Sequence, residues 1–165
     1  MKVYLLRHGD AQDRSVSGRD EDRELTPAGL DKLEQASRGW RRVLEQVDRV
    51  FCSSLIRARQ TAEILHRTAE ASEPIAETEQ LVPYARPLET LQLLQGELQS
   101  GAEGVACVGH EPHMGALLGL LLTGNDHASI PFKKGQLVVV QLDSSASMLG
   151  RLCESLTQTA AAALE

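Results

Sequence analysis

The sequence of 165 residues predicts a single-domain α/β fold with a largely parallel central sheet and helices on both faces. Short apolar runs of strand length, at 3–6, 49–52, 105–109 and 136–142, alternate with segments of helical periodicity. Strands that alternate with helices favour a parallel sheet with right-handed crossovers. The last strand, 136–142, follows a loop, so an antiparallel orientation stays open for it. A chain of this length can form one domain with a sizeable core, and no internal repeat or linker divides it.

The first strand delivers unusual residues to its carboxyl end. Four mostly apolar residues at 3–6 run straight into Arg7, His8 and Gly9. Ligands of open α/β sheets bind at this end of the strands, and Gly9 allows a sharp turn without a Cβ atom. A histidine beside a permanently charged guanidinium suits attack on an anionic phosphorus centre, although a polar strand end facing water explains the tripeptide equally well.

The other elements follow in order. Residues 11–25 are charge-dense without periodicity, so we expect a surface loop over the strand end. Thr26 and Pro27 begin a helix that an apolar stripe extends to about residue 45. Ser53 and Ser54 precede a second helix with Arg57 in its first turn. The remaining expected elements are a short strand near 74–78, a helix at 87–98, a strand at 105–109 that ends before His110, a helix from Pro112, a loop at 123–135 and the strand 136–142.

Composition excludes several classes of protein. The net charge of −6 and an aromatic content of 3% argue against a nucleic-acid binder. No apolar run approaches the ~20 residues of a membrane span, and no signal peptide is evident. The odd count of three cysteines favours reduced thiols and a cytoplasmic protein. The last residues, 161–165, resemble a vector-derived tail, which leaves 1–160 as the expected domain.

Three strand ends carry polar residues that a parallel sheet would bring together. They contribute Arg7 and His8, the segment leading to Arg57, and His110. Two guanidinium groups, two imidazoles and a helix N-terminus form a pocket suited to an anion. This convergence is more specific than any of its parts.

The same residues carry a resemblance to a known family. The segments KVYLLRHGDA, RELTPAG, CSSLIRARQTAEIL, LVP and VGHEP, spread from Lys2 to about Leu122, resemble the histidine phosphatase (phosphoglycerate mutase-like) superfamily, in particular its small SixA-type phosphohistidine phosphatases. The resemblance implies the phosphoglycerate mutase-like fold and a phosphatase that needs no cofactor and no metal.

Roles of individual residues follow from this resemblance. His8 is similar to the nucleophile that carries the phosphoryl group, Arg7 and Arg57 to the arginines that hold its oxygens, and His110 to the second histidine that stabilises charge during transfer. Gly9 and Glu111 are expected to contact the substrate. Cationic side chains can stabilise phosphoryl transfer without a metal.

One departure from the family bears on the substrate. Larger members carry an acidic proton donor in a Leu-x-Glu setting, where this chain reads Leu81, Val82 and Pro83. An imidazole leaving group needs less protonation than an alkoxide, so the missing acid favours protein phosphohistidine over sugar phosphates. Substitute donors remain in the acidic loop, and the candidates are Asp10, Asp13, Glu21 and Asp22.

Alternative interpretations remain. The chain could hydrolyse small phosphoesters, or bind phosphate without catalysis on the same fold. The segment from His110 to His113 lacks the helical spacing of a zinc site. Cys52 precedes Arg57 with four residues between them, one fewer than in cysteine-based phosphatases, and is expected in the core. His66, His113 and His127 are expected at the surface.

Overall fold

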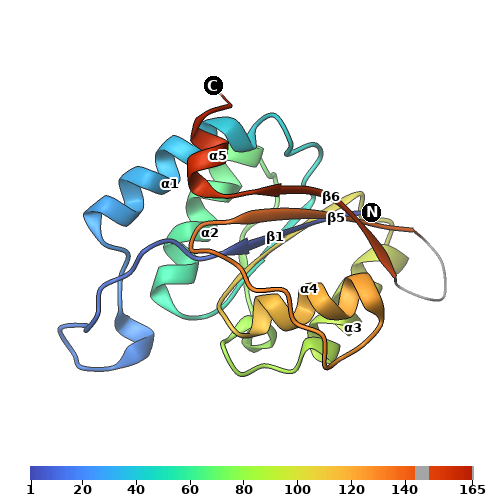
Figure 1. The fold of residues 1–165 in the computed structure, drawn as a ribbon, viewed down its shortest axis with the longest axis horizontal. Helices are drawn as coiled ribbons and strands as arrows, with labels where there is room; N and C mark the ends of the chain where they lie inside the picture. Colours follow the sequence, from blue (N-terminus) through green and yellow to red (C-terminus); the bar gives the residue numbers. More distant parts are fainter. Residues whose placement is uncertain (144–148, 165) are drawn as a thin grey trace.

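A six-stranded sheet runs through the centre of the protein, with helices on both faces (Figure 1). The structure is a computed structural model and describes residues 1–143 and 149–164. Its strands, in the spatial order β3-β2-β4-β1-β5-β6, are β1 (Lys2–Arg7), β2 (Arg49–Cys52), β3 (Ala76–Glu77), β4 (Gly104–Gly109), β5 (Leu137–Leu142) and β6 (Gly150–Leu156).

The strands β3, β2, β4 and β1 pair in parallel. Strand β5 pairs antiparallel with β1, and the edge strand β6 pairs antiparallel with β5. The predicted α/β class with a largely parallel sheet is therefore confirmed. The orientation of 136–142, left open by the sequence, is antiparallel to β1, with Leu5 opposite Val138. On its other side β1 pairs with β4, so that Arg7 lies opposite Gly109.

The helices form two layers. They are α1 (Pro27–Trp40), α2 (Ile56–Ala69), α3 (Pro87–Gln99), α4 (His113–Thr123) and α5 (Gln158–Ala162). Figure 1 shows α1 and α5 on one side of the sheet and α3 and α4 on the other. Side chains of β1 alternate between the two cores: Tyr4 and Leu6 pack with α1 and α2, whereas Val3 and Leu5 pack with α3 and α4.

Local sequence signals explain the starts of two helices. Thr26 caps α1, because its Oγ1 accepts a hydrogen bond from the Gly29 N–H, and Pro27 occupies the first helical position. The N-cap of α2 is Leu55 and makes no side-chain cap. Ser53 instead accepts a hydrogen bond from the Leu55 N–H, one residue before the helix begins.

Two expected boundaries are corrected. Helix α1 ends at Trp40 instead of near residue 45. The apolar stripe misled the prediction because Leu44 and Val47 pack against the core from the segment after the helix. The loop 11–25 also contains a 3₁₀ turn, η1 (Asp20–Asp22), and its ends meet in a bridge between Ala11 and Leu25.

The C-terminal part of the chain contains two elements that the sequence did not predict, β6 and α5. Strand β6 lies at the edge of the sheet and is half exposed, so its sequence lacks a buried apolar run. Ala161 of α5 is fully buried against α1, where a Cβ atom on Gly39 would meet the Ala161 carbonyl oxygen at 1.8 Å. The vector origin of 161–165 stays a prediction, but Ala161 belongs to the packed fold.

None of the described helices is both long and apolar enough to cross a membrane. All three cysteines are free thiols, and Cys52 and Cys107 are buried.

Candidate active site

The two histidines of the predicted site lie next to each other at the carboxyl ends of neighbouring strands. His8 follows β1 and His110 follows β4. The β1–β4 ladder continues one step beyond the strands, because the His8 N–H donates to the Gly109 carbonyl at 3.0 Å. The imidazole centroids are 4.8 Å apart and the ring planes are inclined by 54°.

The imidazole of His8 is held by its own turn. Its Nδ1 lies 2.7 Å from the carbonyl oxygen of Gly9. A carbonyl can only accept, so Nδ1 carries the proton, and in the neutral ring Nε2 keeps its lone pair. Burial, together with the charges of Arg57 and Arg7, lowers the pKa of His8 to about 4. At neutral pH the ring is therefore uncharged, with a defined tautomer.

His110 is more deeply buried, with 1% of its surface exposed. Burial lowers its pKa to about 2, and the nearby His8, Arg57 and Arg7 act in the same direction. Both of its ring nitrogens are buried and have no hydrogen-bond partner among the described residues. A buried polar group without a partner is costly, so such groups are often explained by a function.

The two predicted arginines also present unpaired donors. Arg7 donates from Nη1 to the Phe132 carbonyl at 2.6 Å, and Arg57 donates to Asp20 of η1. The Nε atoms of both arginines are buried and lack a partner in the part of the chain that the structure describes. The charges of both arginines also act on His8, whose pKa they help to lower. Positive charge and donors without a partner are what an oxyanion requires.

Gly9 supports His8 through its backbone. Its carbonyl accepts from His8, and its N–H donates to Thr61 Oγ1 at 3.2 Å. Thr61 is fully buried one turn after Arg57, and its hydroxyl donates to the Arg57 carbonyl at 2.7 Å. This hydroxyl therefore joins the strand end that carries the nucleophile to the helix that carries Arg57. Its spacing of four residues from Arg57 was the only sequence signal for this role.

Glu111 acts on Arg7 indirectly. Its Oε1 accepts a hydrogen bond from the Phe132 N–H at 2.7 Å, and the Phe132 carbonyl accepts from Arg7. Both contacts fix the segment before β5 beside Arg7. These contacts let Glu111 and Gly9 hold the backbone around Arg7 and His8, and their expected contact with a substrate stays a prediction.

The four acidic candidates for proton donation are engaged elsewhere or lie in the loop 11–25. Asp10 pairs with Lys134, which lowers its pKa, and the pKa of Glu21 is lowered by its hydrogen bond with Arg19. Both are therefore ionised at neutral pH. Asp22 accepts from Ser17 at 2.6 Å, and Asp13 lines a surface pocket inside the loop. None of these four forms a hydrogen bond or ion pair with His8 or His110 in the described structure, although Asp10 interacts electrostatically with His8. The acidic residue that reaches the site is Asp20, which the sequence did not single out.

Two other side chains near the site are structural. His113 was expected at the surface but is 2% exposed. It lies 3.0 Å from Thr90 Oγ1 through Nε2 and 3.0 Å from the Ala85 carbonyl through Nδ1, and so anchors the segment after Pro83 to α4. Cys52 is a core residue as expected, and burial raises its pKa to about 12, which leaves it protonated. Within 1–143 and 149–164, no cluster of three or more His, Cys, Asp or Glu side chains could hold a metal ion.

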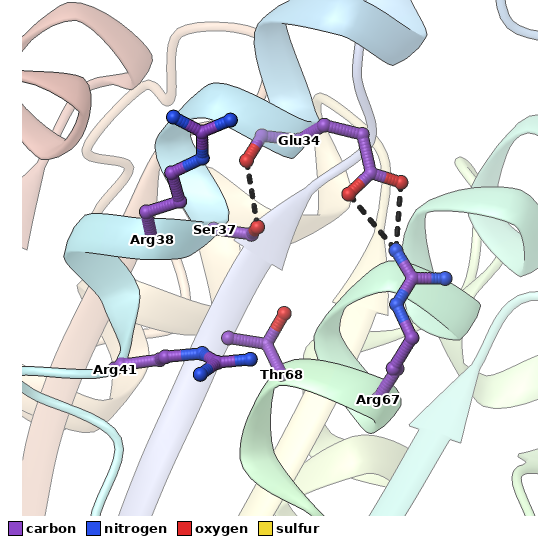
Figure 2. Close-up of a pocket in the computed structure, with 6 residues that line it drawn as sticks. All are labelled: Glu34, Ser37, Arg38, Arg41, Arg67 and Thr68. Atoms are coloured by element: carbon purple, nitrogen blue, oxygen red, sulfur yellow. Dashed lines mark hydrogen bonds and ion pairs between the residues drawn. The ribbon is translucent and has the colours of Figure 1, made fainter.

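A pocket of about 410 Å³ between α1 and α2 is separate from this site (Figure 2). Its lining comes from the later part of α1 and the end of α2, which lie toward the amino ends of the parallel strands. Arg67 binds both carboxylate oxygens of Glu34, at 2.7 and 2.9 Å. Arginines near helix C-termini offset the helix dipole, so this pocket has a sufficient structural explanation.

Comparisons with known proteins identify similar sequences and similar folds. The family model "Histidine phosphatase superfamily (branch 1)" matches residues 3–82. Phosphohistidine phosphatase SixA from Escherichia coli is 27% identical over 149 residues, which are 88% of each protein. A structure of the protein histidine phosphatase SixA complexed with tungstate has a TM-score of 0.86 at 24% identity, covering 96% of this chain and 98% of the other. The α-ribazole phosphatase from Shigella flexneri has a TM-score of 0.66 at 16% identity, covering 96% and 97%.

Proposed function

We propose that this chain, whose residues 3–82 match the model of the histidine phosphatase superfamily, belongs to that superfamily and is a metal-independent phosphatase that forms a phosphohistidine on His8. One observation carries the proposal. The His8 ring is neutral, donates Nδ1–H to Gly9, and keeps the Nε2 lone pair among the unpaired donors of Arg7, Arg57 and His110. A site that only bound phosphate would not need a nucleophile of defined tautomer.

The proposed reaction has two transfers. In the first, the Nε2 lone pair of His8 forms the N–P bond while the bond from phosphorus to the leaving group breaks, and the leaving group keeps that electron pair. In the second, water attacks phosphorus, the N–P bond breaks, and its electron pair returns to His8 while the water's proton is released. Phosphoryl transfer depends mainly on position and charge stabilisation, which the two guanidinium groups and the second imidazole supply.

The proposed substrate is protein phosphohistidine. Three carboxylates near the entrance, Asp10, Asp20 and Glu21, have pKa values lowered by cationic partners, and proline occupies position 83. A leaving group that departs as a strong base would lack a proton donor in this environment. Imidazole is a much better leaving group than an alkoxide. The likeness to SixA supports the same substrate, whereas the shared fold with an α-ribazole phosphatase keeps a small phosphoester as the second candidate.

Rapid-quench labelling tests the proposal. The wild-type protein is mixed with a ³²P-phosphohistidine protein, quenched in alkali and mapped by peptide. The expected label is stable in base, labile in acid and located on His8. The variant His8→Ala should lose both label and turnover. The control is His66→Ala, which removes a ring on α2 that is hydrogen-bonded to the Glu73 carbonyl, and it should keep both. A label on Cys52 or on a serine would refute the nucleophile, and phosphate binding without turnover would favour the non-catalytic alternative.

A further inference from the structure

The outer side of Arg57 is covered by a single acidic residue, Asp20. Arg57 Nη1 donates to the Asp20 carbonyl at 2.8 Å, and Nη2 donates to Asp20 Oδ2 at 2.9 Å. Arg57 is 3% exposed, although the Asp20 side chain keeps 61% of its surface in solvent. The residue therefore approaches Arg57 from the solvent side, with both backbone and side chain.

Asp20 is itself held in place. Arg23 donates to Asp20 Oδ1 from Nε at 2.8 Å, and its Nη1 donates to the Gln12 carbonyl at 2.8 Å. The turn η1 supplies the Asp20 carbonyl that meets Arg57. A continuous chain of contacts thus runs from Gln12 through Arg23 and Asp20 to Arg57, and the carboxylate cannot leave without breaking several of them.

These contacts use only part of the guanidinium. Arginine has five N–H donors in one plane. Asp20 engages one donor on each terminal nitrogen, while Nε is buried and unpaired among the described residues. Thr61 links the Arg57 carbonyl to the Gly9 N–H, so the first turn of α2 lies beside the turn that holds His8. The charge of Arg57 also lowers the pKa of both His8 and His110. The edge that Asp20 leaves free is therefore available to the phosphoryl oxygens.

We propose that Asp20 is a positioning residue that fixes the guanidinium of Arg57 so that its Nε edge holds an oxyanion in front of His8. The identity of that oxyanion as a substrate phosphoryl group rests on the proposed function. The lowered pKa of Asp20, to which Arg57 and Arg23 contribute against the opposing effect of burial, keeps the carboxylate ionised for this purpose.

Two opposing effects must be weighed. A carboxylate near an anion site repels the ligand, so its removal could strengthen binding. Asp20 is largely exposed and already paired with Arg23 at 2.8 Å, so solvent and Arg23 screen this repulsion. Without Asp20, in contrast, the ligand must itself immobilise Arg57, and ordering a flexible side chain weakens binding by roughly three- to tenfold. Positioning is the larger effect.

The test measures binding and turnover separately. The variants are Asp20→Ala and Asp20→Asn, and the control is Glu34→Ala, which removes a carboxylate paired with Arg67 at the other edge of the sheet (Figure 2). Calorimetry with tungstate as the probe should show roughly three- to tenfold weaker binding for Asp20→Ala. Asp20→Asn should lie between it and wild type, because an amide oxygen can still accept from Arg57. Glu34→Ala should match wild type.

A double-mutant cycle separates positioning from general structural damage. In the background Arg57→Ala, the change Asp20→Ala should have no further effect on tungstate affinity. With an aryl phosphate, kcat for Asp20→Ala should fall by about tenfold or more, because displaced oxygens reduce the alignment with His8. Equal or tighter tungstate binding by Asp20→Ala, or an equal effect in the Arg57→Ala background, would overturn the proposal. If wild type bound tungstate in this Asp20-dependent way but never turned over, the positioning would stand and the phosphatase would fail.

Discussion

The Thr61 hydroxyl offers a sharp test of how the nucleophile is held. The change Thr61→Val keeps the shape of the side chain but removes the oxygen that accepts the Gly9 N–H at 3.2 Å. The relative exposure of Thr61 is 0%, so solvent cannot replace the acceptor that the substitution removes. The Gly9 N–H is left buried and unpaired, which costs about 1–3 kcal/mol.

The same helix supplies a matched control. Thr68 Oγ1 donates to the Ile64 carbonyl at 2.7 Å, just as Thr61 Oγ1 donates to the Arg57 carbonyl at 2.7 Å. Thr68 is also buried, but within residues 1–143 and 149–164 no backbone N–H from another element donates to it. The change Thr68→Val therefore removes the shared intrahelical bond alone, and the difference between the two variants isolates the contact with Gly9.

Urea unfolding at pH 7.5 provides the measurement. We expect Thr61→Val to lower the free energy of unfolding by about 1–3 kcal/mol more than Thr68→Val, with unchanged m-values. Because Gly9 also accepts the Nδ1 proton of His8, kcat should fall in Thr61→Val and stay near wild type in Thr68→Val. Equal destabilisation by both variants, together with equal kcat, would refute the claim that this hydroxyl holds the His8 turn.

Three further predictions concern the chemistry. The pKa of His8 is about 4, below the ordinary value of 6.5, so between these two pH values the unfolded chain binds a proton that the folded chain does not. The contribution of neutral His8 to the free energy of unfolding is therefore fully present above pH 6.5 and is lost as the pH falls toward 4. NMR should find its ring neutral at pH 5.5, and a titration near 6.5 would contradict the burial argument. Turnover should survive excess EDTA, since Arg7 and Arg57 supply the positive charge; activity lost to EDTA and restored by zinc or magnesium would contradict this. Alkyl phosphates should react about 10²–10⁴-fold more slowly than aryl phosphates for want of a proton donor at Pro83, and similar kcat values would show that another residue donates.

Much of the fold was available from the sequence because its signals are local. Buried strands such as 3–6 and 105–109 are continuous apolar runs, and the Thr26-Pro27 pair marks a helix start. The edge strand β6 was not predicted, because one of its faces meets water and its sequence therefore has no continuous apolar run. The apolar stripe after Trp40 overextended α1, because it records which residues are buried and not which backbone buries them.

The main residues of the candidate site could also be named in advance. Arg7, His8 and His110 stand at the ends of strand-like runs, and parallel topology alone brings such ends to one edge of a sheet. Short motifs around them are specific enough to indicate a family. In the structure the imidazole centroids of His8 and His110 are 4.8 Å apart, as expected for residues at the ends of neighbouring parallel strands.

Only the tertiary structure decided which carboxylate meets which cation. Asp20, Glu21 and Asp22 are neighbours in one acidic turn and are equivalent in the sequence, yet only Asp20 contacts Arg57, from 37 residues away along the chain. Likewise, the contact between Thr61 and Gly9 spans 52 residues. The reason is physical: apolar periodicity reports burial along one element, whereas a hydrogen bond depends on atoms that only the packing of separate elements brings within about 3 Å. The sequence by itself therefore determined the buried strands and the polar residues at their ends, including the two histidines. Packing decided the rest, because Thr61 of α2 holds the turn of His8 and the loop 11–25 holds Arg57.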